Sequence, residues 1–259
     1  MNAIVNQEMR NNVKHVGAWL SLGSPVIGEL ASSYPFDWLL FDLEHGCGTE
    51  STLLSNLQAA KKTNLALIVR PGKCDPALIS RILDWGADGI MMPHINTPVQ
   101  ALECLRAMQY APYGNRGYSS SARAYNYGVD QLNNQLASGH PLFFAQIETE
   151  EAVKNADEIA KVDGVDVLFI GPADLKWDLN ANGNMFEDKY NEAIKIVVNS
   201  ALNNKKQVGI VAKNAEEMKH YLALGITCIT YASDLIFLKQ GFQHVCDSFI
   251  HVVNRNRVE

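Results

Sequence analysis

The chain has few of the features that mark several protein classes. It contains only five cysteines, an odd number without a CxxC pair, which argues against a disulfide framework or a zinc knuckle and indicates a reducing compartment. It has no basic cluster and a net charge of −6, so we expect no nucleic-acid partner. No apolar run approaches the roughly 20 residues that span a bilayer, and the N-terminus lacks an apolar signal region. We therefore expect no membrane partner and a cytoplasmic location.

What the chain does have is a regular alternation of apolar runs and amphipathic segments. Eight runs are almost continuously apolar, which is typical of strands buried on both faces of a parallel sheet. Two of the helix-like segments begin with a cap residue followed by proline, at Asp75-Pro76 and Thr97-Pro98. Eight such units predict an α/β fold, a (β/α)8 TIM barrel that residues 1–259 form as a single domain. The predicted strands are 16–22, 37–42, 65–70, 89–93, 142–148, 165–171, 207–212 and 226–232, and the predicted helices lie near 25–33, 51–62, 75–85, 97–109, 150–161, 187–204 and 214–224.

Two segments do not fit this alternation. Residues 110–140 are long, polar and rich in Gly, Ser and Tyr, and a connection of this length in a compact domain is usually functional. We expect it either to cover the rim of the barrel as a lid or to reach a neighbouring subunit. Residues 234–253 are apolar with helical spacing, which predicts a C-terminal helical extension that packs against another chain.

Three short acidic segments directly follow predicted strands. They are FDLEHG (41–46), QIETE (146–150) and GPADL (171–175). Parallel barrel strands end at a common rim, where enzymes of this architecture keep their catalytic residues. The residues that we expect at this rim are Asp42, Glu44, His45, Glu148 and Asp174.

The acidic residues of this rim allow two interpretations. Hard divalent cations such as Mg²⁺ and Mn²⁺ prefer oxygen ligands, so Glu148 and Asp174 are candidate metal ligands that leave room for a chelating substrate. Alternatively, each acid caps the helix that follows it. His45 is a candidate functional histidine or a structural hydrogen-bonding group. Arg70 ends a predicted strand, where it can stabilise developing negative charge, pair with a carboxylate, or do both.

The motifs, taken together and in order, resemble the HpcH/HpaI family of metal-dependent (class II) pyruvate aldolases. The strings that carry the resemblance are DWLLFDLEHG, IVRPG, GADGIMMPHINT, YGNRG, AQIETEEAV, GVDVLFIGPADL and ASD at 232–234, and they extend from about residue 14 to 240. The resemblance implies a class II aldolase that reversibly cleaves a 4-hydroxy-2-oxo acid to pyruvate and an aldehyde through a metal-stabilised pyruvate enolate. It also implies a homohexamer, a trimer of dimers whose last helix is exchanged between subunits.

The resemblance further implies a role for particular residues. His45 would be the base, supported by Asp84, while Arg70 would stabilise the enolate and Asp42 would orient metal-bound water. The cofactor would be Mg²⁺, Mn²⁺ or Co²⁺. The implied catalytic residues are thus His45, Arg70, Asp84 and Asp42, the pyruvate-binding residues are Gln146, Ala173 and Asp174, and the metal ligands are Glu148 and Asp174.

Some positions depart from the family, and other functions stay open. Lys176, Trp177 and Asp178 stand where relatives usually have small residues, so we expect residues 176–183 to alter one wall of the site. For His94 we favour a packed core histidine over a site role. One alternative function is an acyl-CoA ester lyase of the citrate lyase and malyl-CoA lyase branch, although the chain has no basic cluster suited to a CoA phosphate tail. Another is a non-catalytic barrel that serves as an assembly module.

Overall fold

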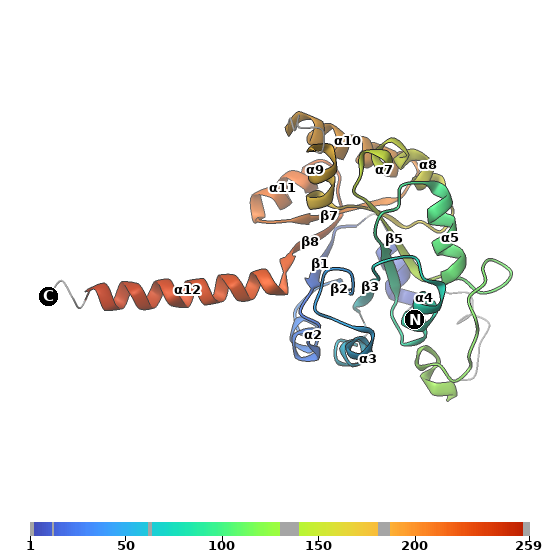
Figure 1. Ribbon diagram of the computed structural model, residues 1–259, viewed down its shortest axis with the longest axis horizontal. Helices are drawn as coiled ribbons and strands as arrows, with labels where there is room; N and C mark the ends of the chain where they lie inside the picture. The colour runs from blue at the N-terminus through green and yellow to red at the C-terminus, as the bar shows by residue number, and fades with distance from the viewer. Residues whose placement is uncertain (1–2, 12, 62–63, 130–139, 181–186, 256–259) are drawn as a thin grey trace.

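Eight parallel strands form a closed barrel in chain order, with the last strand hydrogen-bonded to the first (Figure 1). The computed structural model describes residues 3–11, 13–61, 64–129, 140–180 and 187–255. Every predicted strand is present, with small shifts at its ends, so the (β/α)8 prediction is confirmed. The strands are β1 (His15–Leu20), β2 (Trp38–Asp42), β3 (Ala66–Arg70), β4 (Gly89–Met92), β5 (Leu142–Ile147), β6 (Val167–Ile170), β7 (Gln207–Ala212) and β8 (Cys228–Ser233).

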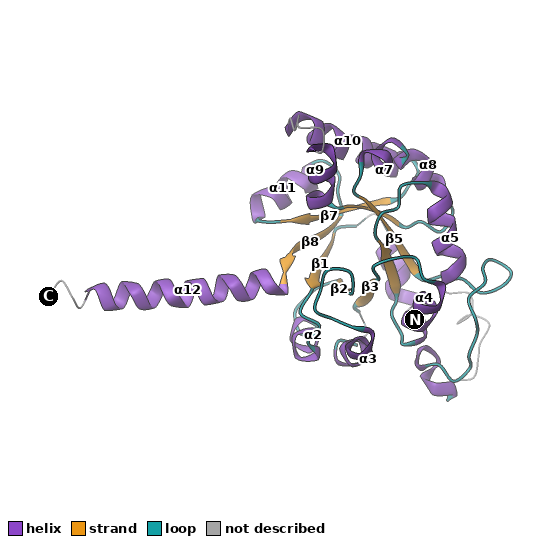
Figure 2. Ribbon diagram, in the orientation of Figure 1, coloured by secondary structure: helices purple, strands orange, loops and turns teal. Residues whose placement is uncertain are grey.

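Helices surround the barrel and lie close to their predicted positions (Figure 2). The two cap-proline signals are confirmed, because Asp75 accepts hydrogen bonds from the first turn of its helix and Thr97 accepts one from Gln100 N. The segment predicted as one helix at 150–161 is two, which meet at Asn155. The surrounding helices are α2 (Pro25–Ala31), α3 (Glu50–Ala59), α4 (Pro76–Asp84), α5 (Pro98–Met108), α7 (Glu150–Lys154), α8 (Ala156–Lys161), α10 (Glu187–Asn203) and α11 (Ala215–Ala223).

The structure adds two helices that the sequence pattern did not predict. Helix α1 (Ala3–Arg10) packs its Val5 and Met9 against the residues that fill the barrel. Its Arg10 bonds Asp166, which directly precedes β6, so α1 lies at the end of the barrel where the strands begin. Helix α9 (Pro172–Asn180) starts at the proline of the GPADL motif, with one residue between it and the end of β6 at Ile170.

The core has an inner and an outer layer. Trp38, Phe144 and Phe169 fill the barrel interior, with the Trp38 ring centroid 5.4 Å from that of Phe144 and 6.0 Å from that of Phe169. The outer layer packs the other face of the strands against the helices. Because both faces of each strand are covered, the strands carry apolar residues without alternation. This rigid frame leaves only the strand ends and their loops to build a site.

The described part of the 110–140 segment lies at the end of the barrel where the strands begin. Arg116 pairs with Asp84 at 2.6 Å, and Arg123 donates a hydrogen bond to Trp85 O, both partners being at the C-terminal end of α4. The helices run antiparallel to the strands, so this position is opposite to the acidic rim. The lid prediction is therefore wrong for residues 110–129, whereas 130–139 lie outside the described residues. Contact with a neighbouring subunit stays a prediction.

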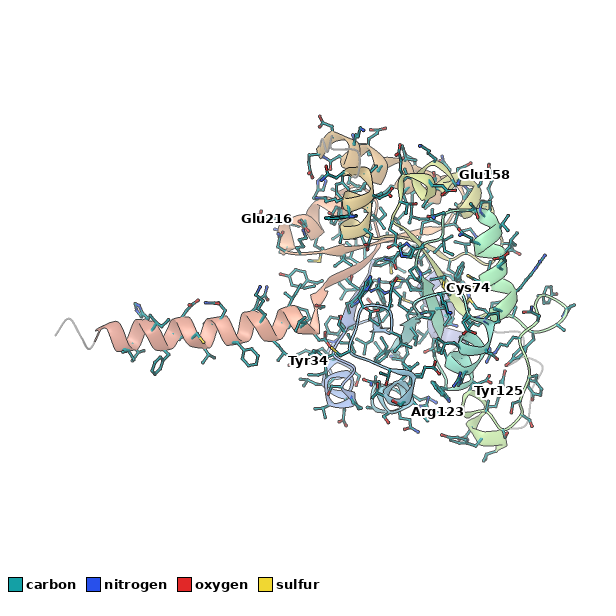
Figure 3. The ribbon with its side chains drawn as sticks, viewed as in Figure 1. Tyr34, Cys74, Arg123, Tyr125, Glu158 and Glu216 are labelled. Carbon is teal, nitrogen blue, oxygen red and sulfur yellow. The ribbon has the colours of Figure 1, made fainter. Side chains whose placement is uncertain are left out.

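The predicted C-terminal extension is a 22-residue helix, α12 (Asp234–Arg255), that projects away from the barrel (Figure 1). Its side chains stand clear of the barrel along most of its length (Figure 3). Within the described residues, no helix combines the length and the apolar character that crossing a membrane requires. The exposed large apolar side chains of α12 are Leu235, Ile236, Phe237, Leu238, Phe242, Val245, Phe249, Ile250 and Val252.

Candidate active site

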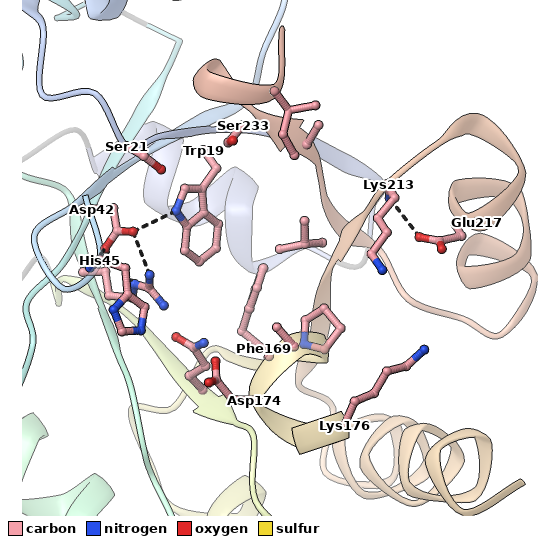
Figure 4. A pocket seen from close by; sticks show the side chains of 18 of the residues that line it. Trp19, Ser21, Asp42, His45, Phe169, Asp174, Lys176, Lys213, Glu217 and Ser233 are labelled. Atoms are coloured by element: carbon pink, nitrogen blue, oxygen red, sulfur yellow. Dashed lines mark hydrogen bonds and ion pairs between the residues drawn. The ribbon is translucent and has the colours of Figure 1, made fainter. Parts of the chain in front are cut away.

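A cavity of about 400 Å³ opens where the strands end (Figure 4). Its wall is formed by the ends of β1, β2, β3, β5, β6, β7 and β8, by the first turns of α9 and α12, and by side chains of α10 and α11. Most of the residues singled out from the sequence meet here, as the common rim of a parallel barrel requires. Those that line the cavity are Asp42, His45, Arg70, Gln146, Ala173 and Asp174.

Arg70 is the centre of a buried ion-pair network on one wall. β2 and β3 pair in a register that sets Asp42 beside Arg70, and the guanidinium donates to both Asp42 oxygens, at 2.9 and 2.7 Å. Its third nitrogen pairs with Glu44 at 2.9 Å, and the group lies over the Trp19 ring, 4.6 Å from the centroid. Trp19 Nε1 also donates to Asp42 at 3.1 Å. Three of the five N–H donors of Arg70 are thus engaged, which leaves two for a ligand.

The two carboxylates of this network differ in pKa. Burial opposes the ionisation of Asp42, but the hydrogen bonds and charge of Arg70, with the hydrogen bond from Trp19, outweigh it and lower the Asp42 pKa. The Glu44 pKa is raised instead, because the effect of burial exceeds the attraction of the Arg70, His45 and His94 charges. Arg70 therefore stabilises Asp42 as an anion.

Glu148 and Asp174 are brought together across the ends of β5 and β6. The Glu148 side chain is buried, and its pKa is raised by burial and further by the nearby charges of Asp174 and Glu44. It can lie so close to β6 only because residue 171 is glycine, since a Cβ there would meet Glu148 Oε2 at 2.5 Å. A second negative charge beside a buried carboxylate is unfavourable unless a cation is shared between them.

His94 is a site residue for which the sequence favoured the other interpretation. It was expected in the core, but its side chain is 58% exposed, so that interpretation is wrong. β4 ends at Met92, and His94 has a left-handed backbone with φ of 54°, which turns it toward the rim. His94 N donates to Glu148 Oε1 at 2.7 Å, and the ring nitrogens lie 3.1 Å from Glu148 and 3.6 Å from Glu44. Its position just beyond a strand was the signal that could have identified it.

His45 is exposed on the turn after β2 and faces the cavity. Its backbone N donates to Asp42 at 3.3 Å, which ties the turn to the ion-pair network. The backbone approaches closely at Gly46, because a Cβ there would collide with the carbonyl oxygens of Asp42 and Ser21. Asp84 ends α4 and pairs with Arg116, so within one chain it lies at the opposite end of the barrel from His45.

The start of α9 offers donors to an anionic ligand. The first backbone hydrogen bond of this helix is from Leu175 N to Gly171 O, so the N–H groups of Ala173 and Asp174 precede the helical pattern. Such N–H groups and the helix dipole favour a carboxylate. Gln146 donates to Glu148, while its buried Oε1 has no hydrogen-bond partner among the described residues. A ligand here would satisfy that oxygen.

The three residues after GPADL that we expected to alter the wall of the site lie in different surroundings. Lys176 lines the cavity, as expected for an altered wall. Trp177 is 81% exposed and does not line it, and Asp178 accepts a hydrogen bond from Glu150 N at 2.7 Å. Residues 181–183 of this stretch lie outside the described residues. Other lining residues that the sequence did not single out are Trp19, Ser21, Phe169, Tyr190, Val211, Lys213, Glu217, Tyr221 and Ser233.

The residues present suit a divalent cation with few protein ligands. Among the residues that the structure describes, no group of three or more His, Cys, Asp or Glu side chains is arranged to hold a metal ion. A pair of carboxylates is nevertheless a donor set that Mg²⁺ and Mn²⁺ accept when substrate and water supply the other oxygens. The raised pKa of Glu148 and the unpartnered Gln146 Oε1 are consistent with a ligand between these residues.

A closed parallel barrel with a carboxylate-rich cavity at its strand ends defines an enzyme of the TIM-barrel class. The chain belongs to the HpcH/HpaI aldolase/citrate lyase family, whose model matches residues 15–240, and it is by this membership a lyase of the aldolase type.

Curated relatives cover almost the whole chain. A 4-hydroxy-2-oxo-heptane-1,7-dioate aldolase from Klebsiella pneumoniae is 34% identical, over 97% of this chain and 95% of the relative. A 5-keto-4-deoxy-D-glucarate aldolase from Escherichia fergusonii is also 34% identical, over 90% of this chain and 91% of the relative. The chain is thus similar to aldolases along its full length.

Solved structures of the family share the fold. A family protein from Burkholderia cenocepacia has a TM-score of 0.88 at 28% identity and covers 96% of this chain and 99% of its own. The citrate lyase beta subunit from Mycobacterium tuberculosis has a TM-score of 0.57 at 18% identity, covers 85% of this chain and 92% of its own, and shares the fold alone. The citrate lyase branch is thus a more distant structural neighbour of this chain.

Proposed function

We propose that the protein is a metal-dependent class II aldolase that cleaves a 4-hydroxy-2-oxo acid to pyruvate and an aldehyde, and that catalyses the reverse condensation. The observation that carries this proposal is the meeting of Glu148, Asp174, Arg70 and His45 at one rim of the barrel. The aldolase names of the relatives support it. A divalent cation held by Glu148 and Asp174 would supply Lewis-acid polarisation of the 2-oxo acid.

The chain's own residues account for the remaining requirements of the reaction. The N–H groups of Ala173 and Asp174 would bind the pyruvate carboxylate at the start of α9. His45 would take the proton of the C4 hydroxyl, so that the C3–C4 bond breaks and its electrons pass to C3 and the carbonyl at C2. The free N–H groups of Arg70 would stabilise the negative charge that develops there. Asp42, in this proposal, holds Arg70 and the His45 turn and orients water beside them.

Support of His45 by Asp84 requires a second subunit in this fold. The two residues of one chain lie at opposite ends of the barrel, so the Asp84 that assists His45 would belong to a neighbouring copy. This agrees with the proposed homohexamer, in which the barrel ends and α12 helices of different copies meet. A cytoplasmic location stays a prediction.

The proposed activity predicts pyruvate release that depends on a metal ion. With Mn²⁺ or Mg²⁺ present, the purified protein is expected to release pyruvate from 4-hydroxy-2-oxo-heptane-1,7-dioate, measured by coupling to NADH oxidation. EDTA should abolish the release, and excess Mn²⁺ should restore it, because Glu148 and Asp174 alone leave the 2-oxo acid unpolarised. Activity that survives complete chelation would remove the metal from the mechanism. A requirement for CoA would favour the acyl-CoA lyase branch instead.

The exposed apolar side of α12 predicts self-association through this helix. Phe242 and Phe249 are each 68% exposed, which is unusual for such large side chains on an isolated surface. Replacing either with lysine is expected to weaken association by about 2 kcal/mol or more, about 30-fold in the dissociation constant, if the ring is buried in the oligomer. Light scattering after gel filtration measures this, with Gln243→Lys on the same helix as the control. A monomeric wild-type protein would contradict the proposal.

A further inference from the structure

The candidate active-site cavity extends well beyond the residues that the proposed cleavage uses. His45 and Asp42 lie at one end, and Phe169 lies between them and the far end (Figure 4). Arg70 belongs to the same end as Asp42, to which it donates two hydrogen bonds. The far end is formed by Lys176 on α9, Lys213 after β7, and Tyr190 and Tyr221 from α10 and α11. No step proposed above needs these four side chains, so the far end is free to recognise the rest of the substrate.

Two ammonium groups enter this end from different elements. Lys213 makes no ion pair within the described part of the chain; its backbone N, and not its side chain, bonds Glu217 at 2.8 Å. Lys176 has its Nζ 4.2 Å from the centre of the Tyr190 ring and 3.6 Å from Glu187, a distance that exceeds a hydrogen bond. Both amines therefore keep donors for a ligand, because each ammonium has three.

The tyrosines add neutral donors to the same end. The Tyr190 hydroxyl is buried beside that of Tyr221 and has no hydrogen-bond partner of good geometry among the described residues. Burial and the Tyr221 hydroxyl raise its pKa, so it stays a protonated donor at neutral pH. A bound oxygen acceptor would give this buried O–H a partner of better geometry than Tyr221 does.

We propose that Lys176 and Lys213 form a carboxylate subsite that selects aldehydes bearing an acid group at the end opposite the carbonyl. The proposal rests on the aldolase function proposed above and names its aldehyde class. A single carboxylate fits better than a phosphate or a CoA tail, because Glu187 and Glu217 lie beside the two lysines and offset part of their charge. The subsite also assigns a specific role to Lys176, which stands where small residues are usual after GPADL.

The test compares two aldehydes of equal carbon number in condensation with pyruvate. We expect the wild-type enzyme to have a higher kcat/KM for 4-oxobutanoate than for butanal. In Lys176→Met and Lys213→Met, the ratio of these two constants is expected to fall by about 10- to 100-fold, the effect of losing a hydrogen bond to a charged group. The fall should lie mainly in KM for 4-oxobutanoate. Lys195→Met, at an exposed position of α10, is the matched control and should keep the wild-type ratio.

The possible results separate a failure of the carboxylate subsite from a failure of the proposed aldolase function. Wild-type constants that are equal for the two aldehydes, or ratios within twofold of wild type in both lysine variants, would overturn the subsite while leaving the aldolase intact. Turnover of neither aldehyde would overturn the proposed function and the subsite with it. Lys213→Arg is expected to keep a preference for 4-oxobutanoate, because the charge remains, whereas a merely structural lysine would leave the ratio unchanged in every variant.

Discussion

The free energy of unfolding is expected to fall by about 3–5 kcal/mol, and turnover to be lost, when Arg70 is replaced by alanine. The guanidinium neutralises Asp42 and Glu44, whose side chains are only 2% and 10% exposed. Removing it leaves two acidic groups in a low-dielectric wall without their counter-charge. The Asp42 pKa, now lowered, should then rise, since burial alone disfavours the anion.

Urea unfolding followed by circular dichroism measures this loss of stability. Arg81→Ala is the matched control, because Arg81 pairs with Glu50 at 2.9 Å while both side chains are about half exposed. Such a surface pair contributes about 0–1 kcal/mol. Arg70→Lys should retain more stability than Arg70→Ala but still lose turnover, because an ammonium cannot repeat the bidentate contact with Asp42. Equal midpoints for Arg70→Ala and wild type would contradict the buried network.

Mn²⁺ affinity is expected to fall by more than about 100-fold in Asp174→Asn, because even residues that only support metal ligands cost 10- to 100-fold when removed. The carboxylate is one of the two proposed protein ligands, and the amide lacks its charge. Turnover should be lost together with binding. The measurement is a Mn²⁺ titration by calorimetry or by the electron paramagnetic resonance signal of the free ion, so it does not depend on activity.

Two further variants make this result specific. Asp178 lies one turn later on α9 and accepts a hydrogen bond from Glu150 N that an amide oxygen can also accept. In Asp178→Asn, the Mn²⁺ affinity should therefore stay within about twofold of the wild-type value. His45→Ala should keep the metal and lower kcat by about 10²- to 10⁴-fold, the usual contribution of a general base. Equal loss of Mn²⁺ binding in His45→Ala and Asp174→Asn would contradict the separate roles assigned to these residues.

Much of the candidate site was predictable because each functional residue follows a strand. Arg70 and Glu148 stand at or just beyond the ends of β3 and β5, and parallel strands in one barrel all end at the same rim. An apolar run and the polar residue after it are neighbours in the chain, so local sequence is enough to place them. The register of β2 on β3 then sets Asp42 beside Arg70.

Local sequence was not enough to place three parts of the chain, which are His94, Asp84 and residues 110–129. MMPHINT places His94 just beyond a strand, but the left-handed turn that directs it to the rim is visible only in the structure. Asp84 took its role from resemblance, yet the helix that it ends returns to the opposite side of the barrel. The 110–129 segment has the composition of a lid but is held at that same side by Arg116 and Arg123.

The sequence alone was sufficient for the eight strands, the barrel and the residues at its rim, because burial and strand direction leave their mark in consecutive positions. It could not supply the partners of those residues. Arg70 pairs with Asp42 and Glu44, and Glu148 lies beside Asp174 and His94, only when elements distant in the chain are packed together. Lys176 and Lys213 come to line one cavity in the same way. Such contacts depend on helix direction, backbone turns and the shape of the cavity, which are properties of the assembled barrel.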